Sequence, residues 1–112
     1  MKKGEVWRVR LPFGPGHTQA GERPAILVQD DPFNVSLPTV LIVPLTGAQA
    51  ATRFAGTLVV QPDNQKGLTM PSVALVFQLS ALDKRDCLNR LGVLDQNTLD
   101  QVFALLDQLT GR

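Results

Sequence analysis

The sequence has few of the residues that build disulfides, metal clusters or membrane spans. Cys87 is the single cysteine among 112 residues, and His17 is the single histidine. A lone cysteine excludes an internal disulfide and a cysteine metal cluster. No apolar run approaches the roughly 20 residues that a membrane span requires, and the basic start at residues 1–5 has no hydrophobic stretch behind it. We therefore expect a cytoplasmic protein without metal, cofactor or membrane contact.

Charge and aromatic content are modest as well. The formal net charge is +1, and the chain has no tyrosine, one tryptophan and five phenylalanines. No overall field attracts nucleic acid, so a site for a polyanion must be local or be formed by two copies of the chain. The 44% hydrophobic and 19% charged residues are typical of a globular protein. We expect one domain, residues 1–112, with a modest core.

The most informative segment is Gly21-Glu22-Arg23-Pro24, followed by an apolar run to Asp30. It comes after a glycine- and proline-rich stretch, residues 12–21, which predicts a long loop. We expect the run that Pro24 opens to be a strand, with Arg23 fixed at its mouth. A guanidinium is a permanent cation with a planar fork of donors, so Arg23 there becomes a receptor for phosphate or carboxylate.

The remaining pattern predicts short strands. Residues 5–11 alternate, with Trp7 on the apolar face and Arg8 and Arg10 on the other, where we favour ordinary solvated charges. Residues 39–45 form the most apolar strand, in which Pro44 requires an edge, a bulge or a strand end. Further strands are expected at residues 56–61, 72–78 and 89–94, a turn at residues 31–34, and a brief helical turn opened by residues 80–83.

The last element is a helix. Asp95 is a suitable N-cap, and Leu94 and Leu99 have the spacing of a hydrophobic staple. Apolar residues then recur at helical spacing up to Leu109, and Gly111 ends the helix. Short strands closed by one C-terminal helix predict a small, strongly bent antiparallel sheet or barrel.

Pieces of the chain, taken in order, resemble the MazF/PemK toxins, a family that includes the plasmid toxin Kid. These pieces run over nearly the whole chain: Gly4-Glu5-Val6-Trp7-Arg8-Val9; Gly16-His17, Gln19, Gly21, Arg23 and Pro24; Thr39 to Thr46; and Gln78, Leu82-Asp83-Lys84 and Arg90-Leu91-Gly92. The resemblance implies a mostly-β, SH3-like barrel of five to seven short strands with a C-terminal helix.

The resemblance also implies partners and an activity. Toxins of this family are homodimers that cleave single-stranded RNA at defined sequences. Their antitoxins carry an acidic, partly disordered tail that occupies the RNA groove. The toxins contact operator DNA only through the antitoxin. For this chain we therefore expect an mRNA substrate, a cognate antitoxin and a second copy.

Metal-free RNA cleavage uses the substrate's own 2′-hydroxyl as nucleophile, so the protein must move protons and stabilise charge on the phosphorus. Arg23 suits the stabilisation, since its fork binds two phosphate oxygens. The resemblance assigns Thr46 beside it, and His17 is the titrating candidate, with an ordinary pKa of about 6.5. We also expect Gln19, Glu22, Gln78 and Arg53 to contact RNA.

Three departures from the family pattern leave the activity open. Thr18 stands where many members carry glutamate, Phe77 where many carry an acidic residue, and Leu75 where Kid-like members carry arginine. Phe77 is interpreted as core or dimer packing, or else as a platform for base stacking. Two alternatives remain: a protein-binding poison of DNA gyrase like CcdB, or a weakened barrel that binds mainly antitoxin and operator DNA.

Overall fold

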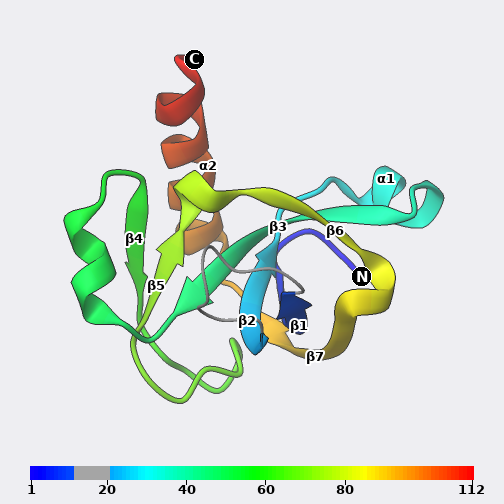
Figure 1. The fold of residues 1–112 in the computed structure, drawn as a ribbon, viewed down its shortest axis with the longest axis horizontal. Helices are drawn as coiled ribbons and strands as arrows, with labels where there is room; N and C mark the ends of the chain where they lie inside the picture. The colour runs from blue at the N-terminus through cyan, green and yellow to red at the C-terminus, as the bar shows by residue number, and fades with distance from the viewer. Residues whose placement is uncertain (12–20) are drawn as a thin grey trace.

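The computed structural model describes residues 1–11 and 21–112 and folds them into one antiparallel sheet with a helix against it (Figure 1). The sheet has seven strands in the order β4-β5-β3-β2-β1-β7, and β6 pairs with β3 off this path. The strands are β1 (Glu5–Leu11), β2 (Gly21–Leu27), β3 (Thr39–Thr46), β4 (Thr57–Val60), β5 (Ser72–Leu75), β6 (Ser80–Asp83) and β7 (Cys87–Val93). The mostly-β class with a C-terminal helix is confirmed.

Helical segments occupy several of the connections. They are α1 (Asp31–Ser36), the short 3-10 helices η2 (Gln49–Arg53), η3 (Val76–Gln78) and η4 (Lys84–Asp86), and the terminal helix α2 (Gln96–Thr110). The Asp95 side chain accepts from the Thr98 backbone N–H at the start of α2, and Gly111 ends it in the left-handed conformation with φ 77°. The predicted caps of this helix are therefore confirmed.

Four strand and turn predictions were wrong in their bounds or type. The second strand begins at Gly21 and ends at Leu27, because β1 pairs with it from Gly21 to Ile26 and β3 pairs with it up to Leu27. Residues 31–34 form the start of α1 rather than a simple turn, and the strand predicted to residue 78 stops at Leu75, where η3 begins. Residues 80–83 are strand β6, since they pair with β3.

Two groups of buried side chains form the core on opposite faces of the sheet. One lies under α2 and the β4–β5 pair and includes Val6, Ile26 and Val102. The other lies among β1, β2, β3, β6 and the start of β7, and it includes Val9, Leu27 and Cys87. Alternation along β1 and β2 sends neighbouring residues to opposite groups, which is the period-2 pattern of a strand buried on both faces.

Cys87 is buried with 9% of its surface exposed, somewhat more deeply than expected. Its burial, together with the nearby carboxylates of Asp86 and Asp83, raises the pKa of the thiol above 9.0. A thiol that stays protonated at neutral pH is a poor nucleophile. Cys87 therefore packs as a small apolar side chain.

The connection between β4 and β5, residues 61–71, lies directly on the backbone of β7. A Cβ on Gly92 would come within 2.1 Å of the Gln65 carbonyl oxygen, and a Cβ on Gly67 within 2.1 Å of the Leu91 carbonyl oxygen. The Val93 N–H donates to the Gln65 carbonyl at 2.8 Å. Only glycine allows so close an approach at these two positions, so the connection is held as a fixed wall.

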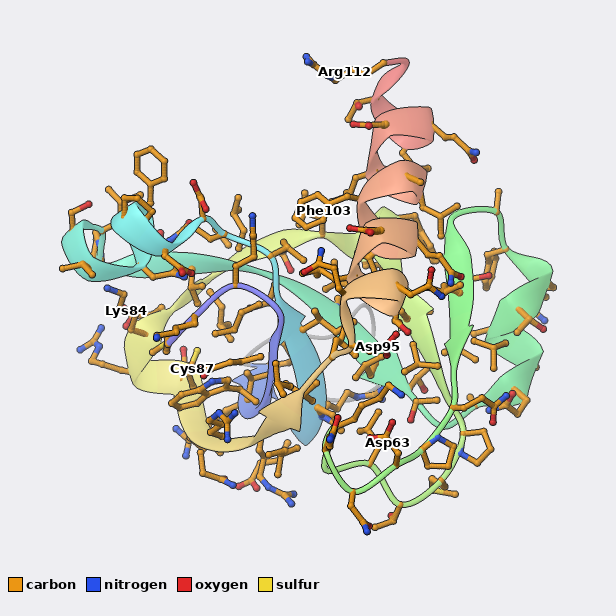
Figure 2. The ribbon with its side chains drawn as sticks, turned by 180° about the vertical axis from the view of Figure 1, so that it is seen from behind. Asp63, Lys84, Cys87, Asp95, Phe103 and Arg112 are labelled. Carbon is orange, nitrogen blue, oxygen red and sulfur yellow. The ribbon has the colours of Figure 1, made fainter. Side chains whose placement is uncertain are left out.

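Lys66 ties this same connection to the start of α2. Its side chain is 9% exposed, and its Nζ lies 2.6 Å from an Asp63 carboxylate oxygen and 3.4 Å from one of Asp95. Figure 2 shows Asp63 on the connection and Asp95 at the beginning of the helix. Hydrogen bonding from Lys66 lowers the pKa of Asp63 below 3.8, and hydrogen bonding to Asp63 raises the pKa of Lys66 above 10.5.

We predict that Lys66→Met lowers the thermal midpoint at pH 7 by several degrees, because two half-exposed carboxylates lose their cation. The stabilisation requires charged Asp63, whose pKa is depressed, and charged Lys66, whose pKa is raised. It is therefore complete between about pH 4 and 10 and is lost as the pH falls below 3.8 or rises past 10.5. Urea unfolding followed by Trp7 fluorescence at pH 7 and pH 3 measures the difference. A difference in the free energy of unfolding between Lys66→Met and wild type that is equal at pH 7 and pH 3 contradicts this prediction.

Candidate functional site

The site begins where β2 and β3 part. The two strands pair in one register, with Leu27 opposite Ile42 and Ala25 opposite Pro44, and the ladder stops there. Both residues next to the break are prolines, Pro24 on β2 and Pro44 on β3, and neither has a backbone N–H to continue it. The position of Pro44 at a break in pairing confirms the sequence expectation.

Arg23 and Thr46 each lie two residues beyond the last β2–β3 pair at this break. If the register is continued by two residues, Arg23 stands opposite Thr46, and both share the sheet face of Ala25 and Pro44. Each is held by another strand: Arg23 pairs with Val9 of β1, and Thr46 pairs with Val73 of β5. Both side chains are half-buried. Arg23 thus lies inside β2 rather than at its mouth, which corrects the sequence prediction.

The Thr46 hydroxyl has a defined orientation. Its Oγ1 accepts a hydrogen bond from the Ala48 backbone N–H at 3.2 Å. This contact leaves the hydroxyl proton available to a ligand, since a hydroxyl donates as well as accepts. A fixed guanidinium and a fixed hydroxyl on one face suit a tetrahedral anion such as phosphate.

The other predicted site residues fall in three places. His17 and Gln19 lie outside the described residues. Glu22 is exposed on the opposite face of β2, where its carboxylate is 3.9 Å from the Arg8 guanidinium. Arg53 lies over the Phe54 ring at 4.7 Å, and Phe54 contacts Phe77, next to Gln78. The structure therefore does not gather all predicted RNA contacts around Arg23.

Three exposed arginines on β1 and β7 form ion pairs, and for Arg8 and Arg10 this agrees with their interpretation as surface charges. Arg8 lies near Glu22, Arg10 is 3.7 Å from Asp86, and Arg90 is 3.0 Å from Glu5. Burial raises the pKa of Glu5, but hydrogen bonds from Trp7, the Lys2 backbone and Arg90 outweigh this, so its pKa lies below 4.5. Glu5 is thus a stable anion at neutral pH.

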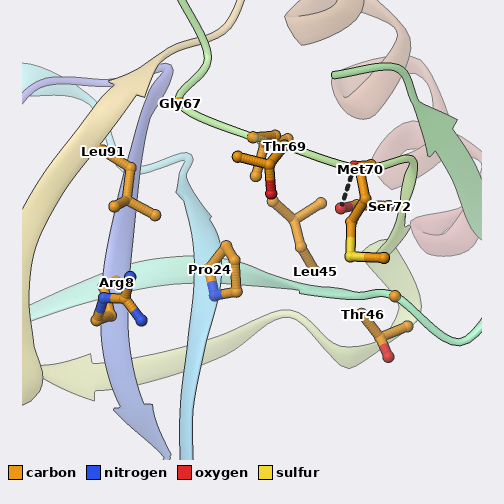
Figure 3. A pocket seen from close by; sticks show the side chains of 11 residues that line it. Arg8, Pro24, Leu45, Thr46, Gly67, Thr69, Met70, Ser72 and Leu91 are labelled. Atoms are coloured by element: carbon orange, nitrogen blue, oxygen red, sulfur yellow. Dashed lines mark hydrogen bonds between the residues drawn. The ribbon is translucent and has the colours of Figure 1, made fainter. Parts of the chain in front are cut away.

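A pocket of about 260 Å³ opens beside the strand ends (Figure 3). It is bounded by β1, the ends of β2 and β3, the wall of residues 61–71 and β7. The sequence analysis missed most of its residues, because residues 61–71 appear only as a polar connection. Gly67, with φ 71°, was the available signal that this connection has a fixed shape. The lining residues are Arg8, Pro24, Leu45, Thr46, Gly47, Gly67, Leu68, Thr69, Met70, Ser72 and Leu91.

Within the described ranges, 1–11 and 21–112, no three His, Cys, Asp or Glu side chains are grouped as a metal site requires. In the same ranges no helix is long and apolar enough to cross a membrane.

Comparison of the sequence with known protein families identifies the family of this chain. The sequence profile of the family described as "PemK-like, MazF-like toxin of type II toxin-antitoxin system" matches residues 2–110. The chain belongs to this family. The resemblance seen in the sequence is therefore confirmed.

Individual proteins that are similar to this PemK/MazF-family chain support the same assignment. An endoribonuclease MazF from Staphylococcus saprophyticus is 28% identical over 107 residues, which cover 96% of this chain and 88% of the relative. Among solved structures, MazF from Deinococcus radiodurans superposes with a TM-score of 0.81 at 21% identity, covering 100% and 97% of the two chains. A mycobacterial endoribonuclease in complex with its cognate antitoxin gives 0.78 at 20% identity, covering 99% and 95%. At these identities the solved structures establish the shared fold.

Proposed function

We propose that this family member is an endoribonuclease that cleaves single-stranded RNA without a metal, at the point where β2 and β3 part beside Arg23 and Thr46. The position of these two residues, each two residues beyond the last β2–β3 pair, is the observation that carries the proposal. It is supported by membership of the PemK/MazF family and by the curated endoribonuclease relative. The family match favours this function over the gyrase-poison alternative.

In the proposed reaction the 2′-oxygen attacks the adjacent phosphorus, and the bond from phosphorus to the 5′-oxygen breaks. One product ends in a cyclic 2′,3′-phosphate, and the other begins with a 5′-hydroxyl. Arg23 binds two phosphate oxygens and stabilises the charge that develops on them. Thr46 orients the phosphate through its hydroxyl. His17 stays the predicted proton acceptor.

The proposed enzyme acts as a homodimer through an exposed apolar patch. The patch consists of Phe54, Phe77 and Leu109, with 46%, 39% and 46% of their surfaces exposed. The two phenylalanine rings are 5.6 Å apart, and a Cβ on Gly56 would come within 3.1 Å of Leu109 and 3.2 Å of Phe77. Clustered aromatic side chains on a surface are typical anchors of a protein interface. This packing role accounts for Phe77 where many relatives carry an acid.

An antitoxin is the second proposed protein partner. Solved relatives from a mycobacterial species and from Deinococcus radiodurans are complexes of toxin with antitoxin. By the resemblance, an acidic segment of such a partner competes with RNA for the cationic site. Arg23 is the residue that both would contact.

We predict that wild-type protein cuts a long single-stranded RNA in EDTA at a short defined sequence, and that Arg23→Ala reduces the rate at least about 100-fold. Removal of one donor to a developing anion typically costs that much. Arg23→Lys keeps the charge but loses the fork, and we expect most of the loss to remain. Mapping both RNA ends by sequencing gives the sites and the end chemistry.

Arg10→Ala is the matched control for Arg23, since Arg10 lies on β1 in an exposed ion pair with Asp86. It should cut at nearly the wild-type rate. Full cleavage by Arg23→Ala would refute the assignment, and a folded wild-type dimer that cuts no RNA would favour the antitoxin-binding alternative.

We predict that Phe77→Glu converts the dimer to monomer, because a charge would be buried in the centre of the proposed interface. Sedimentation equilibrium measures the shift, which should exceed tenfold in dissociation constant. Phe33→Glu is the control, as Phe33 is 53% exposed on α1, at the other side of the molecule from β4 (Figure 1). Equal effects of the two substitutions would exclude this patch as the interface.

A further inference from the structure

The pocket where β2 and β3 part has the size for one flat ring. Pro24 and Leu45 line it, and they adjoin Arg23 and Thr46 in the sequence. Leu68 and Leu91 add apolar surface from the two sides. The volume of about 260 Å³ is just below the ~300–1,000 Å³ of sites for drug-sized ligands. It suits a nucleobase better than a whole nucleotide.

Polar groups stand at the rim rather than the floor. Figure 3 shows the Arg8 guanidinium on one side of Pro24 and Thr69 across from it. The Arg8 contact with Glu22 is long, at 3.9 Å, and both side chains are about half exposed. Such a pair contributes little stability, so Arg8 can turn its donors toward a ligand at little cost.

The rim and floor together match a base with acceptors on its edge. Guanidinium donors pair with carbonyl oxygens such as O6 of guanine, and uracil also carries two carbonyls. Adenine and cytosine carry an amino group at the position where guanine carries O6 and uracil carries O4, and an arginine cannot accept a proton from that amino group. The apolar floor meets the face of the ring, as in other readers of unpaired bases.

We propose that this pocket reads one keto base, uracil or guanine, next to the cleaved phosphate, and that Arg8 determines the preference. The inference rests on the proposed RNA cleavage, because Pro24 and Leu45 of the pocket adjoin Arg23 and Thr46 in the chain, and Thr46 itself lines the pocket. A nucleotide whose phosphate lies where β2 and β3 part can turn a neighbouring base into the pocket. Arg8 is here a specificity residue, not a catalytic one.

The pocket is rigid before any ligand binds. Its outer wall is residues 67–70, which follow Lys66 with its two carboxylate partners. Gly67 lies directly against the Leu91 carbonyl. Ser72 donates to the Met70 carbonyl at 3.3 Å, which closes the lower turn of the wall. Because the walls are already ordered, binding costs less conformational entropy, and the pocket selects ligands by shape.

The first test compares cleavage maps of one long RNA cut by wild type and by Arg8→Gln. We expect one position near the cut to hold uracil or guanine in wild-type products. Arg8→Gln should relax that preference by roughly five- to a hundredfold, the range of a bidentate base contact, and still cut. Arg10→Gln, on the same strand and face but outside the pocket, should keep it. A preference unchanged in Arg8→Gln overturns the proposal.

A second test does not depend on cleavage. Isotope-labelled wild type is titrated with 2′-O-methyl oligonucleotides, and the backbone amide shifts are followed. The oligonucleotides carry uracil, guanine, adenine or an abasic site at the position that the cleavage map identifies. If no cut is found, each position of the oligonucleotide is varied in turn. We expect amide shifts at Arg8 and at residues 67–72 with the keto bases, and at least about fivefold weaker binding with adenine or the abasic site. Shifts that are absent there, or equal for all oligonucleotides, overturn the pocket. Failure of cleavage with base-specific shifts overturns only the proposed reaction.

A substitution that fills the pocket but keeps Arg8 tests the contribution of pocket shape apart from that of the Arg8 charge. Thr69→Trp places a ring over the pocket from an exposed position, so it should fold and lose base-specific shifts. Asn64→Trp lies on the same connection but outside the lining residues and serves as its control. Base-specific shifts that survive in Thr69→Trp contradict the proposal.

Discussion

The arrangement of the molecule depends on the change of partner that β3 makes at Pro44. Before it, β3 pairs with β6 as far as Ile42, and after it with β5 from Leu45 onward. A residue without an N–H cannot bond to both neighbours, so the break falls there. Thr46 therefore pairs with Val73 of β5, beyond the last β2–β3 pair, so β2 and β3 part beside Arg23. Pro24 and Leu45 of the pocket lie at this parting.

In the proposed function, neighbouring residues of the same two strands have two tasks. Alternation along β2 and β3 directs Arg23 and Pro24, and likewise Thr46 and Leu45, to opposite sides. The proposed charge stabilisation and the proposed base recognition are thereby separated by one residue in each strand.

Many of the helices and strands could be predicted from the sequence, where local patterns were strong. The helix from Asp95 to Gly111 was predicted with both caps, and so was the strand ending at Thr46, because periodicity and capping are local. The segments at residues 31–34 and 80–83 were misassigned. A six-residue helix has too few turns to show a period, and β6 is a strand only because it pairs with β3. Arg8 was interpreted as a surface charge, since its place at a pocket depends on residues 61–71.

The sequence by itself determined the family, with an arginine after a glycine-bearing stretch, a threonine ending an apolar strand, and a terminal helix. Residue types and local order carry that information. Only the tertiary structure decided that Arg23 and Thr46 lie where β2 and β3 part and that Arg8, Leu68 and Leu91 line one pocket. Those neighbours come from strand register and from glycine contacts between distant segments, because register is fixed by pairing across the sheet and not by any one strand.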